Sequence, residues 1–259
     1  MAIPPARRLL RSGFESDWHW LGSRPCRWRR SLSIRCLDGG ESCLVVDLGD
    51  AIDLAVNRQV RALGLALERA RVRGVLEAVP TYRSLAIYYD PLTIDRNALG
   101  QRVGTLYDSL DDQDDQTPRI VEIPTVYGGK YGPDLEFVAR HSGLSRDEVV
   151  RLHSEPLYHV YMLGFMAGFP YLGDLAEQLT VPRLSTPRLK VPAGSVGIGG
   201  RQTGIYPVES PGGWRIIGRT SIRLFDPSAE APTLLLPGDK VRFVQREPHE
   251  YESEQRGRL

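Results

Sequence analysis

The stretch GFMAGFPYLG, from Gly164 to Gly173, combines three aromatic residues with a methionine, a proline and repeated glycine. Glycine interrupts it too often for a helix. The side chains of Phe165, Phe169 and Tyr171 make it too apolar for an ordinary solvated turn. We therefore interpret this stretch as the shaped wall of a pocket.

The sequence on both sides of this stretch indicates many short strands. Arg119–Ile123, Leu157–Leu163 and Lys240–Gln245 have strand character, and the turn Pro237-Gly238-Asp239 precedes the last of them. Glycine and proline recur at short intervals between them. Short strands separated by turn signals predict a closed β barrel rather than a parallel α/β sheet.

The first half of the chain has a different pattern. Short strands are expected at Ser31–Leu37 and Cys43–Leu48, and again at Gly74–Val79 and Ser84–Tyr89. Asp50 is the expected cap of an amphipathic helix. Its apolar face is Ile52, Val56, Val60, Leu63 and Leu67, and a second helix is expected to bury Leu99, Val103, Leu106 and Leu110. The order β-β-α-β-β-α predicts a small α+β domain with both helices on one face of the sheet.

The acidic run from Asp111 to Gln116 contains no apolar residue and precedes Pro118, which is typical of a linker. We expect an α+β domain over 31–112 and a mainly β barrel domain over 118–246. Residues 1–30 are arginine-rich and lack any helical or strand period, so a disordered extension is expected there, and residues 247–259 are expected to form a flexible tail.

Composition excludes several classes of protein. The chain has 259 residues, of which 41% are hydrophobic and 25% charged, and its formal net charge is +1. These values are typical of a globular protein with no overall field for nucleic acid or an anionic membrane. No apolar run approaches the ~20 residues that span a bilayer. The three cysteines, Cys26, Cys36 and Cys43, form no zinc pattern, so reduced thiols and a cytoplasmic location are expected.

Two motifs resemble nucleic-acid or nucleotide sites but lack the necessary residues. Leu135–Ser154 has the outline of a helix-turn-helix, with Ser145 and Glu148 as a capping box, yet the second helix would present Asp147 and Glu148 to DNA, so a packed helical hairpin is expected. Gly194–Gly204 contains glycines without the spacing of a dinucleotide fingerprint or a phosphate loop.

Polar residues near the aromatic stretch suggest a substrate site. Neutral donors such as Ser195, Gln202 and Thr203 suit a carboxylate, an amide carbonyl or an oxyanion, although strand-turn glycines explain the same segment without a ligand. His153 is a candidate acid or base and equally a structural histidine, and Arg219 is a candidate anion clamp. The candidate substrate-binding residues are Phe165, Gly168, Phe169, Tyr171, Pro192, Gly194, Ser195, Gln202, Thr203, Ser210, Gly212, Gly213 and Trp214, the candidate catalytic residues are His153 and Arg219, and no metal ligand is assigned.

Five segments together resemble a known family. They are YGGKYGPDLE (Tyr127–Glu136), GLSRDEVVRLHS (Gly143–Ser154), VYMLGFMAGFPYLG (Val160–Gly173), TPRLKVPAGSVGIGGRQTGIYPVESPGGWRIIGRT (Thr186–Thr220) and LFDP (Leu224–Pro227). The chain is similar to the family of 5-oxoprolinase B subunits. That family is also called KipI and allophanate hydrolase subunit 1, and is similar to half of the carboxyltransferase domain of urea carboxylase. The likeness spans about Ser31 to Val244, and Ala167 stands where the family usually has proline.

The resemblance implies a cyclophilin-like barrel behind the small α+β domain. It also implies that the chain acts with the A and C subunits of 5-oxoprolinase in the ATP-dependent hydrolysis of 5-oxo-L-proline to L-glutamate, with ATP and Mg²⁺ used by the complex. Two alternatives stay open. One is a KipI-like inhibitor of a sensor histidine kinase, and the other is a carboxyltransferase or allophanate hydrolase-type subunit of urea metabolism.

Overall fold

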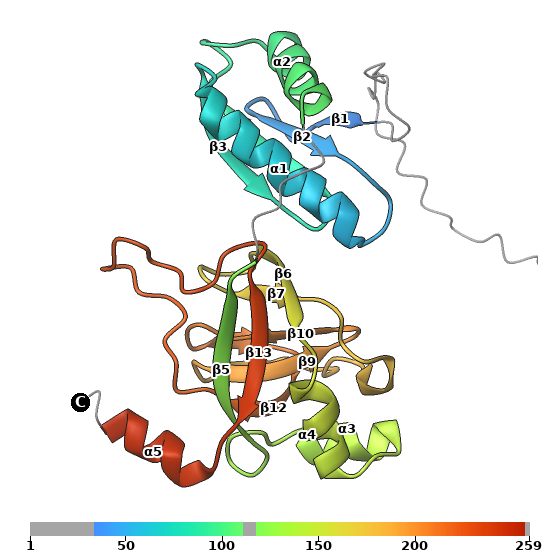
Figure 1. Ribbon diagram of the computed structural model, residues 1–259, viewed down its shortest axis with the longest axis vertical. Helices are drawn as coiled ribbons and strands as arrows, with labels where there is room; N and C mark the ends of the chain where they lie inside the picture. Colours follow the sequence, from blue (N-terminus) through green and yellow to red (C-terminus); the bar gives the residue numbers. More distant parts are fainter. Residues whose placement is uncertain (1–33, 111–117, 257–259) are drawn as a thin grey trace, which may run out of the picture.

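The computed structural model describes residues 34–110 and 118–256 (Figure 1). The expected N-terminal extension, the acidic linker and Cys26 lie outside these residues. Cys36 and Cys43 are both buried. Across the described residues, none of the helices has the length and apolarity needed to span a membrane.

The first part of the structure is a four-stranded antiparallel sheet with two helices on one face (Figure 1). The helices bury the apolar side chains of the sheet in a core of their own, which includes Leu44, Val46, Leu85 and Ile87. The expected α+β arrangement is therefore confirmed. The strands lie in the sheet in the order β1-β2-β4-β3. Along the chain, the elements are β1 (Arg35–Asp38), β2 (Cys43–Asp47), α1 (Leu54–Ala70), β3 (Val75–Pro80), β4 (Ser84–Tyr89) and α2 (Arg96–Asp108).

Helix α1 begins three residues later than its pattern suggests. Its N-cap is Asp53, whose side chain accepts a hydrogen bond from the backbone N–H of Val56 at 3.0 Å. Asp50 pairs instead with Arg35 at 2.6 Å, and Ile52 lies outside the helix with 57% of its surface exposed. The expected cap at Asp50 was wrong, because a second aspartate offers the same capping chemistry nearer to the first helical turn.

The second part is a closed barrel of seven strands in the order β10-β7-β6-β13-β5-β12-β9. Strand β13 pairs with β5 in parallel, from Lys240↔Ile120 to Gln245↔Thr125, and every other barrel pairing is antiparallel. This confirms the predicted barrel. Its strands are β5 (Ile120–Tyr127), β6 (Tyr158–Leu163), β7 (Pro170–Leu172), β9 (Ser195–Gly199), β10 (Gln202–Ile205), β12 (Arg215–Arg219) and β13 (Lys240–Gln245).

Three smaller features surround the barrel. The helical hairpin of α3 (Leu135–Ser142) and α4 (Arg146–Ser154) packs on β12 and β13, with its capping box of Ser145 and Glu148 formed. A two-stranded sheet pairs β8 (Arg188–Val191) with β11 (Ser210–Gly212), and a short 3-10 helix covers Glu177–Leu179. The sequence from 248 to 256, which was expected to be flexible, forms helix α5 (Pro248–Arg256), because its polar residues find partners on the barrel.

His153 lies inside the barrel core. Its ring is 0% exposed, Nδ1 is 2.8 Å from the hydroxyl of Tyr127, and Nε2 is 2.8 Å from the hydroxyl of Thr203. Burial lowers the pKa of His153 to about 3, so the ring is neutral near pH 7. With both nitrogens occupied by core hydroxyls, His153 has a structural role in this geometry rather than the proposed role of a proton carrier to substrate.

Asn57, on α1, connects the two parts of the chain. It is 0% exposed, and its amide nitrogen lies 3.0, 3.1 and 3.1 Å from the carbonyl oxygens of Thr81, Tyr82 and Tyr161. Its amide oxygen is 3.3 Å from Nε2 of His159 on β6. Because Tyr161 and His159 belong to the barrel, one buried amide fixes the position of the α+β sheet against it.

We predict that Asn57→Ala lowers the free energy of unfolding by roughly 2–3 kcal/mol, because it leaves buried carbonyl groups without a donor. Urea denaturation measures this change. Small-angle scattering should also show a larger radius of gyration, since the two parts lose their buried connection. Asn97→Ala, at an exposed position on α2, is the matched control and should change neither quantity. Equal stability and size in the two variants would contradict the role of Asn57.

We also predict a pH dependence from His153. The unfolded chain protonates this ring near pH 6.5 and the folded chain only near pH 3, so stability falls as the pH drops through that window and is fully present above it. The slope is about 1.4 kcal/mol per pH unit for one such proton. His153→Gln should remove this part of the slope in urea titrations between pH 4 and 6. An NMR titration showing a protonated His153 ring at pH 5 would contradict the prediction.

Candidate functional site

The aromatic residues of the opening stretch gather on the outside of the barrel. Phe169 lies at their centre, with ring centroids 5.6 Å from Phe165, 5.1 Å from Tyr171, 5.3 Å from Tyr206 and 5.5 Å from Trp214. Every one of these pairs is edge-to-face, the arrangement that aromatic rings favour. With Val191 and Ile216 they form an apolar cluster separate from the barrel core.

Glycines in β9 and β10 make room for Trp214. Val196 and Ile198 point into the barrel core, so Gly197 and Gly199 face outward, where Gly197 lies against the Cβ atom of Trp214 and Gly199 against its ring. A Cβ atom added at Gly199 would lie 2.6 Å from the Trp214 ring, and one at Gly204 would lie 3.1 Å from it. The glycine-rich segment is therefore a platform for an indole ring.

Phe165 is the exposed end of this cluster. It is 64% exposed and its φ angle is +63°, in the left-handed region that a phenylalanine rarely adopts. Gly168, in the same turn, has φ +77°. The turn is closed by a hydrogen bond from the N–H of Gly164 to the carbonyl oxygen of Phe169 at 3.1 Å, and Ala167 is exposed in it. The fold thus holds an apolar ring toward solvent in a strained conformation, which is typical of a functional position.

The aromatic contacts continue into the α+β sheet. Tyr82 lies 5.9 Å from Tyr171 and 5.4 Å from Tyr161, and the amide of Gln202 donates a hydrogen bond to its hydroxyl. Burial raises the pKa of both Tyr82 and Tyr171, so both stay neutral. The guanidinium carbon of Arg183 lies 5.7 Å from the centroid of Trp214. Phe169 and Trp214 are only 1% and 6% exposed, so Phe165 is the ring of this group that is most open to solvent. We call Phe165, Phe169, Tyr171, Trp214 and Tyr82 the aromatic surface.

Sequence reasoning missed Tyr82, Tyr161 and Arg183. Tyr82 is far in the sequence from the rings that it contacts, Tyr161 and Tyr171, and nothing in the run Thr81-Tyr82-Arg83 distinguishes it from an ordinary turn. Arg183 follows Pro182 in a loop that offered only turn signals. A contact between distant segments leaves no mark in the local pattern of either.

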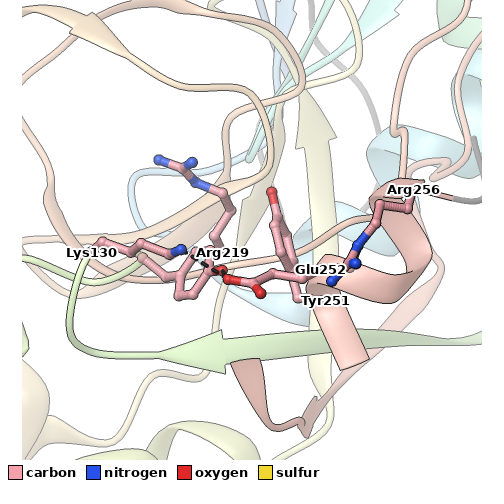
Figure 2. Close-up of a pocket in the computed structure, with 6 residues that line it drawn as sticks. Lys130, Arg219, Tyr251, Glu252 and Arg256 are labelled. Atoms are coloured by element: carbon pink, nitrogen blue, oxygen red, sulfur yellow. Dashed lines mark hydrogen bonds and ion pairs between the residues drawn. The ribbon is translucent and has the colours of Figure 1, made fainter. Parts of the chain in front are cut away.

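Arg219 lies away from the aromatic surface, at the opposite end of β12 from Trp214. It lines a pocket of about 490 Å³ together with Lys130, Tyr131, Tyr251, Glu252 and Arg256. Figure 2 shows the Lys130 ammonium and the Glu252 carboxylate pointing toward each other, and the Arg219 guanidinium extending away from that pair. Nε of Arg219 is buried and lacks a hydrogen-bond partner among the described residues.

The structure thus divides the candidate residues among separate places. Ser195 is 0% exposed and pairs with Arg219 across β9 and β12, while Thr203 bonds to His153 in the core. The remaining candidate substrate-binding residues belong to the aromatic surface or to turns and short strands near it. Pro192 is exposed, Gly194 has φ +77°, Ser210 and Gly212 lie on β11, and Gly213 precedes Trp214. The single pocket that the sequence suggested is not formed by this chain alone.

Among the residues that the structure describes, no group of three or more histidine, cysteine, aspartate or glutamate side chains is placed to hold a metal ion. The basic residues of the Arg219 pocket suit an anion. The aromatic surface suits an apolar partner or a flat ring.

Comparisons with known proteins agree with this architecture. The family model described as "Carboxyltransferase domain, subdomain C and D" matches residues 34–235. The chain is 47% identical over 213 residues to the 5-oxoprolinase B subunit of Escherichia coli O157:H7, covering 81% of this chain and 95% of that protein. It is 40% identical over 229 residues to the 5-oxoprolinase B subunit of Bacillus subtilis strain 168, covering 83% of this chain and 95% of that protein.

A solved structure shares the fold. The crystal structure of TTHA0988 matches with a TM-score of 0.71 and 42% identity, over 79% of this chain and 40% of that one. The chain therefore spans less than half the length of TTHA0988. The match of residues 34–235 and the 40–47% identity over most of the chain show that the chain belongs to the carboxyltransferase subdomain C and D family, and they confirm its resemblance to the 5-oxoprolinase B subunits.

Proposed function

We propose that this chain is the B subunit of an ATP-dependent 5-oxoprolinase that opens 5-oxo-L-proline to L-glutamate together with the A and C subunits. The observation that carries the proposal is 47% identity along 95% of a 5-oxoprolinase B subunit. The chemistry explains the need for several subunits. A five-membered lactam is an unactivated amide, and water attacks it slowly unless its carbonyl oxygen becomes a better electron acceptor.

The aromatic surface supports a role at a subunit interface. Phe165 exposes 64% of its surface, and the left-handed backbone holds it outward. Exposed aromatic residues in a fixed conformation are typical anchors of protein interfaces. More than half of TTHA0988 lies outside the part that this chain matches, so in that protein a similar module is joined to further polypeptide. We assign the aromatic surface to contact with the C subunit.

In the assembled enzyme, the rings of this surface would exclude water from the space between the subunits. The amide of Gln202, held by the hydroxyl of Tyr82, would present its oxygen as an acceptor there. Arg183, which lies over the Trp214 ring, would add a positive charge at the edge of the aromatic surface. Each of these contributions positions groups in a site that the partner completes.

Mg·ATP does not fit this chain. The segment Gly194–Gly204 forms strands β9 and β10 under an indole ring rather than a phosphate-binding loop, and the described residues supply no acidic cluster for Mg²⁺. We therefore assign ATP to the other subunits and derive no step through it.

The proposal is tested by reconstitution. This chain, mixed with purified A and C subunits, 5-oxo-L-proline and Mg·ATP, should form L-glutamate, and omission of this chain should reduce the rate to background. Glutamate release is followed with a coupled dehydrogenase assay. An equal rate from the A and C subunits without this chain would refute the proposal.

We predict that Phe165→Gly weakens binding to the C subunit without lowering the stability of the fold. Glycine adopts φ +63° without strain, so relief of about 1 kcal/mol should offset the lost contact with Phe169, and the free energy of unfolding should stay within about 1 kcal/mol of the wild type. The affinity for the C subunit should fall at least about tenfold, as measured by calorimetry. The control is Leu92→Ala, because Leu92 is 97% exposed and lies between β4 and α2 of the α+β domain. Unchanged affinity in Phe165→Gly would exclude Phe165 from the interface.

A further inference from the structure

The guanidinium of Arg219 has no carboxylate partner in the described part of the chain. Other arginines of the barrel have one: Arg119 pairs with Asp239 at 2.5 Å and Arg188 pairs with Asp134 at 2.8 Å. Nε of Arg219 is buried and makes no hydrogen bond to any described residue. A buried donor without a partner is costly, and Arg219 as a whole is half-buried, so its accessible guanidinium nitrogens can receive an anion from outside that also satisfies Nε.

Ser195 is a second buried polar group beside Arg219. The two residues are directly opposite each other in the β9–β12 ladder. Residues opposite each other in an antiparallel pair project to the same face, with Cβ atoms about 5 Å apart. Oγ of Ser195 is buried and lacks a hydrogen-bond partner among the described residues. An oxygen of an anion placed between them would satisfy both donors.

The pocket around Arg219 has the size and charge of a small-anion site. Its volume of about 490 Å³ falls within the range of small-ligand sites, and three of its six lining residues, Lys130, Arg219 and Arg256, are basic. Its single acidic residue, Glu252, is already bound at 2.9 Å by Lys130 and at 3.1 Å by the hydroxyl of Tyr131. Glu252 therefore occupies part of the pocket with a carboxylate of the chain itself (Figure 2).

Helix α5 supplies that carboxylate and is attached on both sides of Arg219. Toward β5, Glu252 binds Lys130, and Tyr251 packs on Tyr131 with centroids 4.8 Å apart. Toward the segment after β12, the hydroxyl of Ser221 donates to Glu254. The Lys130–Glu252 pair is solvent-exposed, with 70% and 43% of the side chains accessible, and such pairs contribute at most about 1 kcal/mol. Helix α5 also lies beyond the residues 34–235 that the family model matches.

We propose that Arg219, with Ser195 beside it, binds a small carboxylate or phosphate anion, and that helix α5 limits access to this site by placing Glu252 in its entrance. The proposal deepens the proposed function and rests on it only for the identity of the anion. That anion would be the carboxylate of 5-oxo-L-proline or a phosphate released in the reaction.

The test uses the full chain and isothermal titration with three probes. These are 5-oxo-L-proline, inorganic phosphate and 2-pyrrolidinone, which has the same lactam ring without the carboxylate. We expect one of the two anions to bind and 2-pyrrolidinone not to bind. Glu252→Gln should bind that anion several-fold more tightly, because the substitution removes the negative charge at the entrance and leaves the Lys130 ammonium without its carboxylate partner. Arg219→Gln should bind at least tenfold more weakly than the wild type, and Ser195→Ala several-fold more weakly.

Arg223→Gln is the matched control, since Arg223 is exposed and already pairs with Asp226 at 2.9 Å. Its affinity should equal that of the wild type, and thermal melting should verify that every variant is folded. Equal affinity in Arg219→Gln and the wild type would overturn the site, as would the absence of anion binding to Glu252→Gln. Unchanged affinity in Glu252→Gln would overturn the role of α5.

The reconstituted reaction separates the two proposals. Anion binding that depends on Arg219, combined with no glutamate formation by the three subunits, would retain the anion site and refute the oxoprolinase function. Glutamate formation at the wild-type rate with Arg219→Gln, combined with no anion binding, would retain the function and refute the site.

Discussion

The packing of the Trp214 ring against glycines of β9 and β10 is the constraint on which the rest of the barrel's outer face depends. Gly199 and Gly204 lie against the indole ring, and a Cβ atom at Gly199 would come within 2.6 Å of it. Alanine at that position would push the ring outward and separate it from Phe169, which is 5.5 Å away. The ring in turn anchors Phe169 and Tyr171, and through Tyr171 the contact with Tyr82 of the α+β sheet.

Strand β12 gives the barrel two apolar layers rather than one. Successive residues of a strand project to opposite faces, and the ladder of β12 with β9 also shifts register between Ile216 and Gly218. Ile217 packs in the barrel core and Ile216 packs in the outer cluster with Trp214. A bulge of this kind redirects side chains without ending the strand. The same strand therefore supports both the interior of the fold and the outer aromatic cluster.

The sequence predicted the fold better than the site, and the reason is physical. Periodicity and turn residues are local, so they located β4 and β13 at their observed bounds and the capping box of α4 at Ser145 and Glu148. A site is made of contacts between distant segments. Phe169 and Trp214 were both candidate substrate-binding residues, whereas the burial of His153 and the contact with Tyr82 depended on how the barrel closes.

The separation of Trp214 and Arg219 along one strand limits what a single small ligand can touch. Five residues of extended strand span about 16 Å, whereas a lactam the size of 5-oxoproline is only about 6 Å long. One such molecule cannot reach both ends of β12. Any ligand of the aromatic surface and any ligand of the Arg219 pocket would therefore be different groups, one apolar or flat and the other anionic.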